Sequence, residues 1–224
     1  KKLSLSKNNI HGCEVMWKGI RVEQGGTLYL FNNTLIADAE HAAWVVPTLT
    51  GSAGSATSAD IRGNRFERNH IGLYIASGGG SGSVSTPSFA GGLTHTIAGN
   101  SFEGGSLLVP CGIGSPGTLT GTGYAGIVNS GSLHLTVGTS GTSGYSNAFN
   151  NLRFGIINQN GWLNVYRGDF SNITGGTTTG IPTAGAAVFH SGGLSMQTRN
   201  SRFSNCTYGI YGQGGNYIVR QNTV

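Results

Sequence analysis

Large apolar residues alternate with other residues in short runs along much of the chain. Examples in which one residue separates the two apolar side chains are Leu28 and Leu30, Leu133 and Leu135, Leu163 and Val165, and Leu194 and Met196. Successive side chains of a strand point to opposite faces, so this alternation predicts short strands with one buried face. Gly, Asn or Asp separates the runs, and no segment of 10–12 residues has a helical period. The pattern therefore predicts an all-β protein.

An Asn-x-Phe signature recurs along the chain, and a Gly-hydrophobic pair begins six residues after the aromatic residue. The clearest copies are Asn64–Phe66, which leads to Gly72, and Asn147–Phe149, which leads to Gly155. Taking the aromatic or aliphatic position as an anchor gives Ile10, Ile36, Phe66, Phe102, Phe149, Phe170, Phe203 and Val224. Self-similarity of this kind indicates a repeat architecture.

The anchors are 26, 30, 36, 47, 21, 33 and 21 residues apart, so the shortest interval occurs twice. A unit of about 21 residues suits one coil of three short strands and three turns, with equivalent strands stacked about 4.8 Å apart. We therefore predict a single domain over residues 1–224, a parallel β-helix of about seven to eight coils. The extra residues are rich in Gly, Ser, Thr and Pro and predict loop insertions near 47–59, 76–92, 109–123, 138–146 and 174–184.

Asparagine recurs two residues before the anchor and two residues after it. The first group is Asn64, Asn100, Asn147 and Asn222, and the second is Asn151, Asn172 and Asn205. Asparagine tolerates left-handed backbone, and its amide both donates and accepts hydrogen bonds. We interpret both groups as columns of turn-stabilising side chains rather than as ligands for a metal or a substrate.

The charge of the chain is low for its length. Only 9% of its 224 residues are charged, and 13 basic and 8 acidic residues give a net charge of +5. The basic residues form no stripe interleaved with aromatic residues, so we expect no nucleic-acid partner. A hydrophobic content of 37% in regular positions argues against a disordered chain.

Cysteine, histidine and apolar runs suggest neither a metal site nor a membrane span. Cys13, Cys111 and Cys206 lie far apart, which leaves open three small buried side chains or one disulfide and one free thiol. The histidines share no offset that would form a metal site, so we expect no metal and no cofactor. No apolar run approaches 18 residues, so we expect no membrane insertion.

The repeated Asn-x-Phe-x-Asn and Gly-Ile-x-hydrophobic units resemble those of right-handed parallel β-helix proteins of the pectin-lyase-like superfamily, over nearly the whole length. The segments Cys13–Ile20, Gly25–Leu28 and Ile36–Ala42 resemble β-helix segments of large secreted and surface proteins of bacteria, many exported by type IX secretion. The resemblance implies an extracellular location and a modular parent protein. Neither end resembles a polar capping repeat, so we expect the chain to be a segment of a longer protein.

Few residues suggest catalysis. Enzymes of this superfamily that cleave acidic glycans hold carboxylates, Arg or Lys on one outward face, whereas this chain has eight carboxylates and no Asp-Asp pair. Glu40, His70 and Arg153 each lie four residues after an anchor, and the register predicts that Glu40 and His70 are about 5 Å apart on neighbouring coils. They form either an acid–base pair or an exposed charge pair at a turn.

A second column lies eight residues after the anchor, or at the equivalent place in coils with insertions. It contains Arg21, Trp44, Tyr74, Val128, Ile157, Val188 and Tyr211. Because their neighbours are predicted to point inward, these side chains should point outward and form an apolar stripe. The stripe either lies beneath the long loops, contacts another protein subunit, or stacks on sugar rings through Trp44, Tyr74 and Tyr211.

These observations favour a non-catalytic structural or adhesive module of a secreted or cell-surface bacterial protein, with protein subunits or cell-surface glycans as partners. The alternative is a carbohydrate-active β-helix, either a polysaccharide lyase, a glycoside hydrolase or a glycan-binding module.

Overall fold

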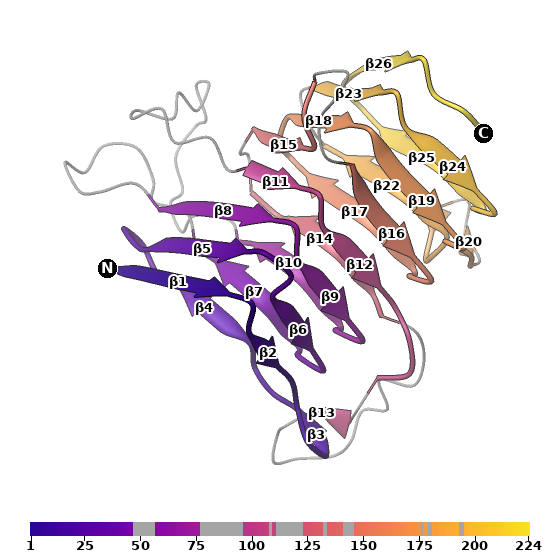
Figure 1. The fold of residues 1–224 in the computed structure, drawn as a ribbon. Helices are drawn as coiled ribbons and strands as arrows, with labels where there is room; N and C mark the ends of the chain where they lie inside the picture. The colour runs from indigo at the N-terminus through magenta and orange to yellow at the C-terminus, as the bar shows by residue number, and fades with distance from the viewer. Residues whose placement is uncertain are drawn as a thin grey trace.

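The computed structural model contains three parallel sheets that wind around one core (Figure 1). The structure describes residues 1–46, 57–76, 96–107, 109–110, 123–131, 134–140, 146–175, 177–178, 181–192 and 195–224. Each coil adds one strand to each of the three sheets, in the same order every time. The protein is therefore a parallel β-helix, and the all-β prediction is confirmed.

Sheet 1 has eight strands in the described residues and follows the chain order without a crossover. Its strands are β1 (Lys2–Ser6), β5 (Thr27–Phe31), β8 (Ser58–Arg62), β11 (Thr96–Ala98), β15 (Leu135–Val137), β18 (Leu163–Tyr166), β23 (Ser195–Arg199) and β26 (Asn216–Arg220).

Sheets 2 and 3 have seven strands each in the same part of the chain. Sheet 2 consists of β2 (Asn9–Ile10), β6 (Leu35–Ala37), β9 (Arg65–Glu67), β12 (Ser101–Glu103), β16 (Asn147–Asn150), β19 (Gly168–Ser171) and β24 (Arg202–Ser204). Sheet 3 consists of β4 (Ile20–Val22), β7 (His41–Val45), β10 (Ile71–Ile75), β14 (Ala125–Asn129), β17 (Phe154–Gln159), β22 (Ala186–Ser191) and β25 (Tyr208–Gln213). The strands give seven complete coils, and β26 begins an eighth.

The anchor residues pair in register along sheet 2, as the repeat predicts. The pairs join Ile10 to Ile36, then Phe66, Phe102, Phe149, Phe170 and Phe203 in turn. The five phenylalanine rings stack nearly parallel, with centroids 4.7–5.2 Å apart. Their stacking fills the core with aromatic surface at the spacing of the strands.

The glycine of the signature leaves room for these rings. A Cβ on Gly126 would lie 2.6 Å from the Phe149 ring, and a Cβ on Gly155 would lie 2.6 Å from the Phe170 ring. In each case the ring belongs to the following coil. The recurrent Phe and Gly are therefore one packing unit that spans two neighbouring coils.

The asparagines before the anchors form a buried ladder, which confirms their structural role. Asn100 Oδ1 accepts hydrogen bonds from the backbone N–H of Asn64 at 3.0 Å and from its side-chain amide at 3.2 Å. Asn100 Nδ2 donates to the Ile61 carbonyl at 2.8 Å and to Asn147 Oδ1 at 3.1 Å. Each amide thus joins its own turn to the next coil.

The asparagines after the anchors adopt left-handed backbone, as their turn position predicts. Asn151, Asn172 and Asn205 have φ values of 54°, 54° and 52°. At the same position the second and third coils have Asp38 and Arg68, with φ of 58° and 50°. The Arg68 guanidinium donates two hydrogen bonds of 2.9 Å to the carboxylate of Asp38, which is buried.

Most residues of the predicted insertions lie outside the described residues, and two of the insertions contain short strands where they are described. Ser58 and Ala59 belong to β8, and the preceding residues 47–56 lie outside the described residues, as do 77–92, 111–122 and 141–145. Inside 174–184, β20 (Thr177–Thr178) and β21 (Ile181–Pro182) pair as antiparallel strands.

One further pairing joins distant coils. β13 (Val109–Pro110) follows sheet 2 of the fourth coil and pairs in parallel with β3 (Val15–Met16) of the first coil. Figure 1 shows β3 and β13 side by side at the lower edge of the molecule. The chain therefore reaches back over three coils before it returns to β14.

Candidate functional site

The outer face of sheet 3 carries the apolar column that the sequence predicts, with one change. The register aligns Arg21 with Trp44, Tyr74, Val128, Ile157, Phe189 and Tyr211. We call the residues Trp44, Tyr74, Val128, Ile157, Phe189 and Tyr211 the apolar strip. Its six strands span about 24 Å at the usual strand spacing.

The prediction that Val188 belongs to this column is wrong. Val188 is fully buried and pairs with Ile156 and Ile210, so it points into the core. Its neighbour Phe189 takes the place in the strip. Because of the insertion after Phe170, the predicted register is wrong by one residue. A shift of one residue moves a side chain to the opposite face of a strand.

The middle of the apolar strip is more buried than its ends. Val128 is 6% exposed and Ile157 is 4% exposed, whereas Trp44, Tyr74 and Phe189 are half-buried. The buried members join a second apolar cluster outside the core, which also contains Ile71, Ala125, Phe154 and Ala186. The strip thus presents two aromatic ends on either side of a covered centre.

At the first end, the aromatic rings contact one another rather than facing solvent side by side. Trp44 and Tyr74 meet edge to face, with centroids 5.4 Å apart and planes at 88°. His41 lies within 5.1 Å of the Trp44 centroid and 5.2 Å of the Tyr74 centroid. The Arg21 guanidinium lies 4.6 Å from the centroid of Trp44. Cation–π and edge contacts therefore occupy the faces of the indole.

At the second end, the rings of Phe189 and Tyr211 stack at 5.7 Å with planes 3° apart. Phe154 meets Phe189 at 5.8 Å, and Tyr208 meets Tyr211 at 5.8 Å, both edge to face. These contacts fix the aromatic side chains against rotation. The surface is accordingly rigid as well as apolar.

The ionisable residues form a line at the corner between sheets 2 and 3. The backbone N–H of Ile71 donates to the Glu40 carbonyl, which places Glu40 and His70 at equivalent positions of neighbouring coils. Tyr124 follows on the fourth coil and Arg153 on the fifth, so Tyr124 separates His70 from Arg153. The sequence did not show Tyr124 at this position, because an insertion precedes it.

The side chains along this line form two groups of contacts, Lys18 with Glu40 and His70 with Tyr124 and Arg153. The Lys18 ammonium forms an ion pair with Glu40 at 2.7 Å. His70 stacks on Tyr124 at 5.4 Å, and the Arg153 guanidinium lies 5.7 Å from the centroid of Tyr124.

The imidazole of His70 favours its neutral form. Burial lowers the pKa of His70, and the charges of His41 and Arg153 lower it further, while Glu40 acts in the opposite direction. Its Nδ1 is buried without a hydrogen-bond partner in the described residues. The Lys18 ammonium donates hydrogen bonds to both carboxylate oxygens of Glu40. Among the described residues, His70 therefore has no acid or base hydrogen-bonded to it.

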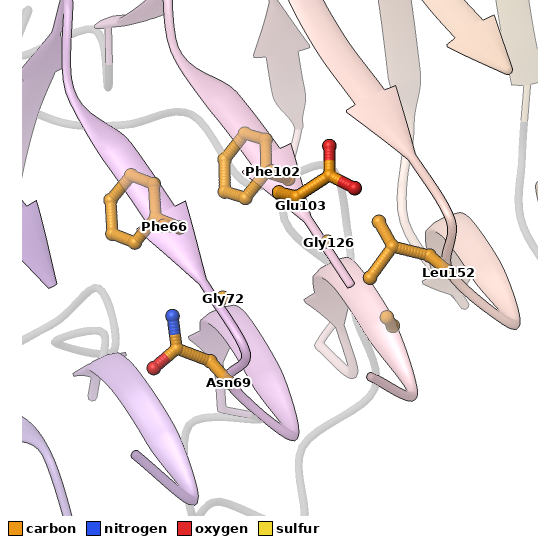
Figure 2. Close-up of a pocket in the computed structure, with 8 residues that line it drawn as sticks. Phe66, Asn69, Gly72, Phe102, Glu103, Gly126 and Leu152 are labelled. Atoms are coloured by element: carbon orange, nitrogen blue, oxygen red, sulfur yellow. The ribbon is translucent and has the colours of Figure 1, made fainter. Parts of the chain in front are cut away.

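Two hollows are found among the described residues, and neither contains Glu40, His70 or Arg153 in its lining. One is lined by Phe66, Asn69, Phe102, Glu103 and Leu152, from neighbouring coils (Figure 2). It has no room for a water molecule. The second, of about 500 Å³, lies beside β1 and β4 and includes Lys1, Lys2, Arg21 and Glu23 in its lining.

A second outward face, on sheet 1, was missed in the sequence. Leu163 and Val165 of β18 are fully buried, so Trp162, Asn164 and Tyr166 alternate with them on the outer side. Trp162 is 41% exposed, more than the aromatic members of the apolar strip. The alternation of Leu163 and Val165 is visible in the sequence, and it predicts that the residues between and beside them, Trp162, Asn164 and Tyr166, point outward.

Cys13 is exposed and Cys206 is partly buried, and both are free thiols, while Cys111 lies outside the described residues. Within the described part of the chain, no three His, Cys, Asp or Glu side chains converge to hold a metal ion. Nor does that part contain a helix long and apolar enough to cross a membrane. Comparison with family models, curated proteins and solved structures finds no match.

Proposed function

We propose that this chain is a non-catalytic module of a secreted or cell-surface bacterial protein, a rigid adhesive element that contacts a protein partner through its apolar strip. The parallel β-helix supports a rigid role, because every coil is bonded to its neighbours through three sheets. The observation that carries the proposal is the in-register strip on the outer face of sheet 3. On either side of its buried centre, each end of the strip exposes two adjacent aromatic side chains, Trp44 with Tyr74 and Phe189 with Tyr211, which exceeds the scattered exposure of single apolar residues.

The composition and geometry of the strip favour a protein over a sugar. Protein interfaces are enriched in Tyr, Trp, Phe and Arg, and these types account for Arg21, Trp44, Tyr74, Phe189 and Tyr211. Sugar stacking needs an open ring face, whereas the Trp44 ring already contacts the Arg21 guanidinium and meets Tyr74 edge to face. Rings held by their neighbours lose little side-chain entropy when a partner binds.

The test is adhesion of the fluorescently labelled protein to bacterial and host cells. We expect Trp44→Ala and Tyr211→Ala each to reduce adhesion about tenfold, because each removes an aromatic anchor near an end of the strip. Protease treatment of the cells should abolish binding, and glycosidase treatment should leave it unchanged. Tyr29→Ala, on the outer face of sheet 1, is the matched control and should bind like the wild type.

Adhesion that survives both substitutions in the strip would refute the proposal. Loss of adhesion after glycosidase but not after protease would instead assign the strip to a glycan. Thermal unfolding monitored by circular dichroism shows that each variant is folded before adhesion is compared.

A carbohydrate-active enzyme is the second candidate, and one observation favours it. Glu40, His70, Tyr124 and Arg153 line one corner of the same sheet, so a glycan on that face would meet an acid, an imidazole, a phenol and a guanidinium. Incubation with a panel of neutral and acidic polysaccharides tests this candidate by the release of reducing ends or unsaturated products. Turnover that Glu40→Gln or His70→Ala abolishes would replace the adhesive proposal with an enzymatic one.

A further inference from the structure

The outer face of sheet 1 near its C-terminal edge brings aromatic, amide and guanidinium groups together. The register places Asn164 beside Gln197, and Tyr166 beside Arg199 and then Arg220. Trp162 immediately precedes β18 on the same side. We call the residues Trp162, Asn164, Tyr166, Gln197, Arg199 and Arg220 the sheet 1 platform.

The side chains of the platform are held by contacts with one another and with the strand before them. His134 lies 5.6 Å from Trp162 between ring centroids, and its Nε2 receives a hydrogen bond from the Asn164 amide at 2.7 Å. When the side-chain oxygen of Gln197 faces Arg199, it accepts a hydrogen bond of 2.9 Å from the Arg199 guanidinium. Trp162 nevertheless keeps 41% of its surface exposed.

The platform lies in the part of the chain where positive charge is not neutralised. Residues 104–224 contain five arginines and one carboxylate, that of Asp169, which gives a net charge of +4 for this part. Arg202 holds Asp169 at 2.9 Å. All eight side-chain carboxylates lie in the described residues, and no ion pair there includes Arg199 or Arg220.

The N-terminal strands of the same sheet show the contrast. Arg62 of β8 points outward and pairs in register with Ala98 of β11. Its guanidinium forms an ion pair of 2.6 Å with Asp60 of the same strand. Arg199 and Arg220 occupy neighbouring outward positions without such a partner, on strands about 4.8 Å apart, so two like charges share one face. Like charges on neighbouring strands repel, and an anion bound between them would relieve that repulsion.

We propose that the sheet 1 platform binds a glycan that carries anionic groups. The exposed indole of Trp162 stacks on a sugar ring, and the amides of Asn164 and Gln197 meet its hydroxyl groups. Arg199 and Arg220 bind a carboxylate or sulfate group, because a guanidinium matches two oxygens of such an anion at once. Ser195, which lies beside Trp162, is four residue steps from Arg199, a span of about 13 Å, so the ligand is longer than one sugar ring.

Two features favour a glycan over a nucleic acid. Single-stranded nucleic acids bind to successive aromatic side chains along a basic groove, whereas here the exposed Trp162 stands at the end opposite the arginines and Tyr166, beside them, is half-buried. The groups between them are uncharged amides, which suit hydroxyl groups rather than phosphates. This site is on a different sheet from the apolar strip and does not depend on the adhesive function proposed for that strip.

Titration calorimetry of the whole chain with defined oligosaccharides tests the proposal. The probes are a heparin octasaccharide for sulfate groups, a hexauronate for carboxylates and cellohexaose as the neutral control. We expect one of the anionic probes to bind and cellohexaose to bind at least about tenfold more weakly, because each charge-assisted hydrogen bond contributes that much. The stronger anionic probe identifies which oxyanion the platform prefers.

Matched variants separate the platform from the rest of the surface. Trp162→Ala and Arg199→Gln should each weaken binding of the preferred probe about tenfold or more. Arg62→Gln, an arginine on the same face of the same sheet, and Tyr74→Ala in the apolar strip should leave it unchanged. Binding that is equal in all four variants, absence of binding by both anionic probes, or tighter binding of a single-stranded oligodeoxythymidylate than of either would overturn the proposal.

Discussion

The asparagine ladder allows a sharp prediction, because Asn100 is only 1% exposed and joins three coils. Asn100→Ala removes its amide without adding bulk. The backbone N–H of Asn64 then loses its acceptor, and the carbonyl of Ile61 loses its side-chain donor. Asn147 Oδ1 keeps the backbone N–H of Asn100, so its loss is smaller.

The magnitude follows from those two groups. A buried polar group without a partner costs about 1–3 kcal/mol, so two such groups lower the free energy of unfolding by about 4 kcal/mol. Urea unfolding followed by circular dichroism measures this difference. Asn164→Ala, which removes an exposed amide on sheet 1, is the control and should change the free energy of unfolding by less than about 0.5 kcal/mol.

The isosteric change Asn100→Asp sharpens the test. It retains the acceptor for Asn64 but places a carboxylate oxygen where Nδ2 donated to the Ile61 carbonyl. Burial and the loss of a donor raise the pKa of this carboxyl group above that of the unfolded chain, so the variant regains stability relative to the wild type as the pH falls from 7 to 5. An Asn100→Ala variant as stable as Asn164→Ala would show that the ladder contributes little, and the reasoning would be wrong.

Three further outcomes are expected from the same kind of measurement. Gly155→Val should lower the free energy of unfolding by about 2 kcal/mol, because its two γ-methyl groups add bulk beyond a Cβ that already lies 2.6 Å from the Phe170 ring. Arg68→Ala should cost about 2 kcal/mol, since it leaves the buried carboxylate of Asp38 without its two charge-assisted hydrogen bonds. Burial lowers the pKa of His190, so its contribution to stability is complete above pH 6.5 and is lost as the pH falls through its folded pKa; the pH dependence of the urea midpoint measures this.

Each of these expectations has its own control. Ala187 occupies the position of Gly155 in the next coil, so Gly155→Ala should cost less than Gly155→Val, and equal costs would refute the packing argument. Arg65→Ala removes a more exposed guanidinium and should have a smaller effect than Arg68→Ala. His190→Gln should reduce the loss of stability at acid pH. An unchanged pH dependence of the urea midpoint would show that other groups cause that loss.

The sequence predicted the scaffold well because the repeat is encoded by contacts between equivalent residues. Phe66 and Phe102 stack directly, and Asn64 and Asn100 bond directly, so spacing in the chain reports spacing in the structure. Short side chains such as Gly126 recur for the same reason, since the ring of Phe149 needs their space.

The surface was harder to predict because outward positions depend on counting through insertions. Tyr124 follows a long insertion and therefore had no place in the predicted line between His70 and Arg153. Val188 was placed outward by an error of one residue, and Phe189 was lost from the strip. The core does not correct such an error, because Ala187 and Val188 are both buried and the alternation breaks there.

The pairing of β3 with β13 has a mechanical consequence. A solenoid pulled from its N-terminal end can in principle peel one coil at a time, since each coil contacts only its neighbours. Here the first coil is also bonded to a segment that leaves the fourth coil. Peeling the first coil therefore requires this pairing to break as well. We expect the first coil to detach at a higher force than it would through its contacts with the second coil alone.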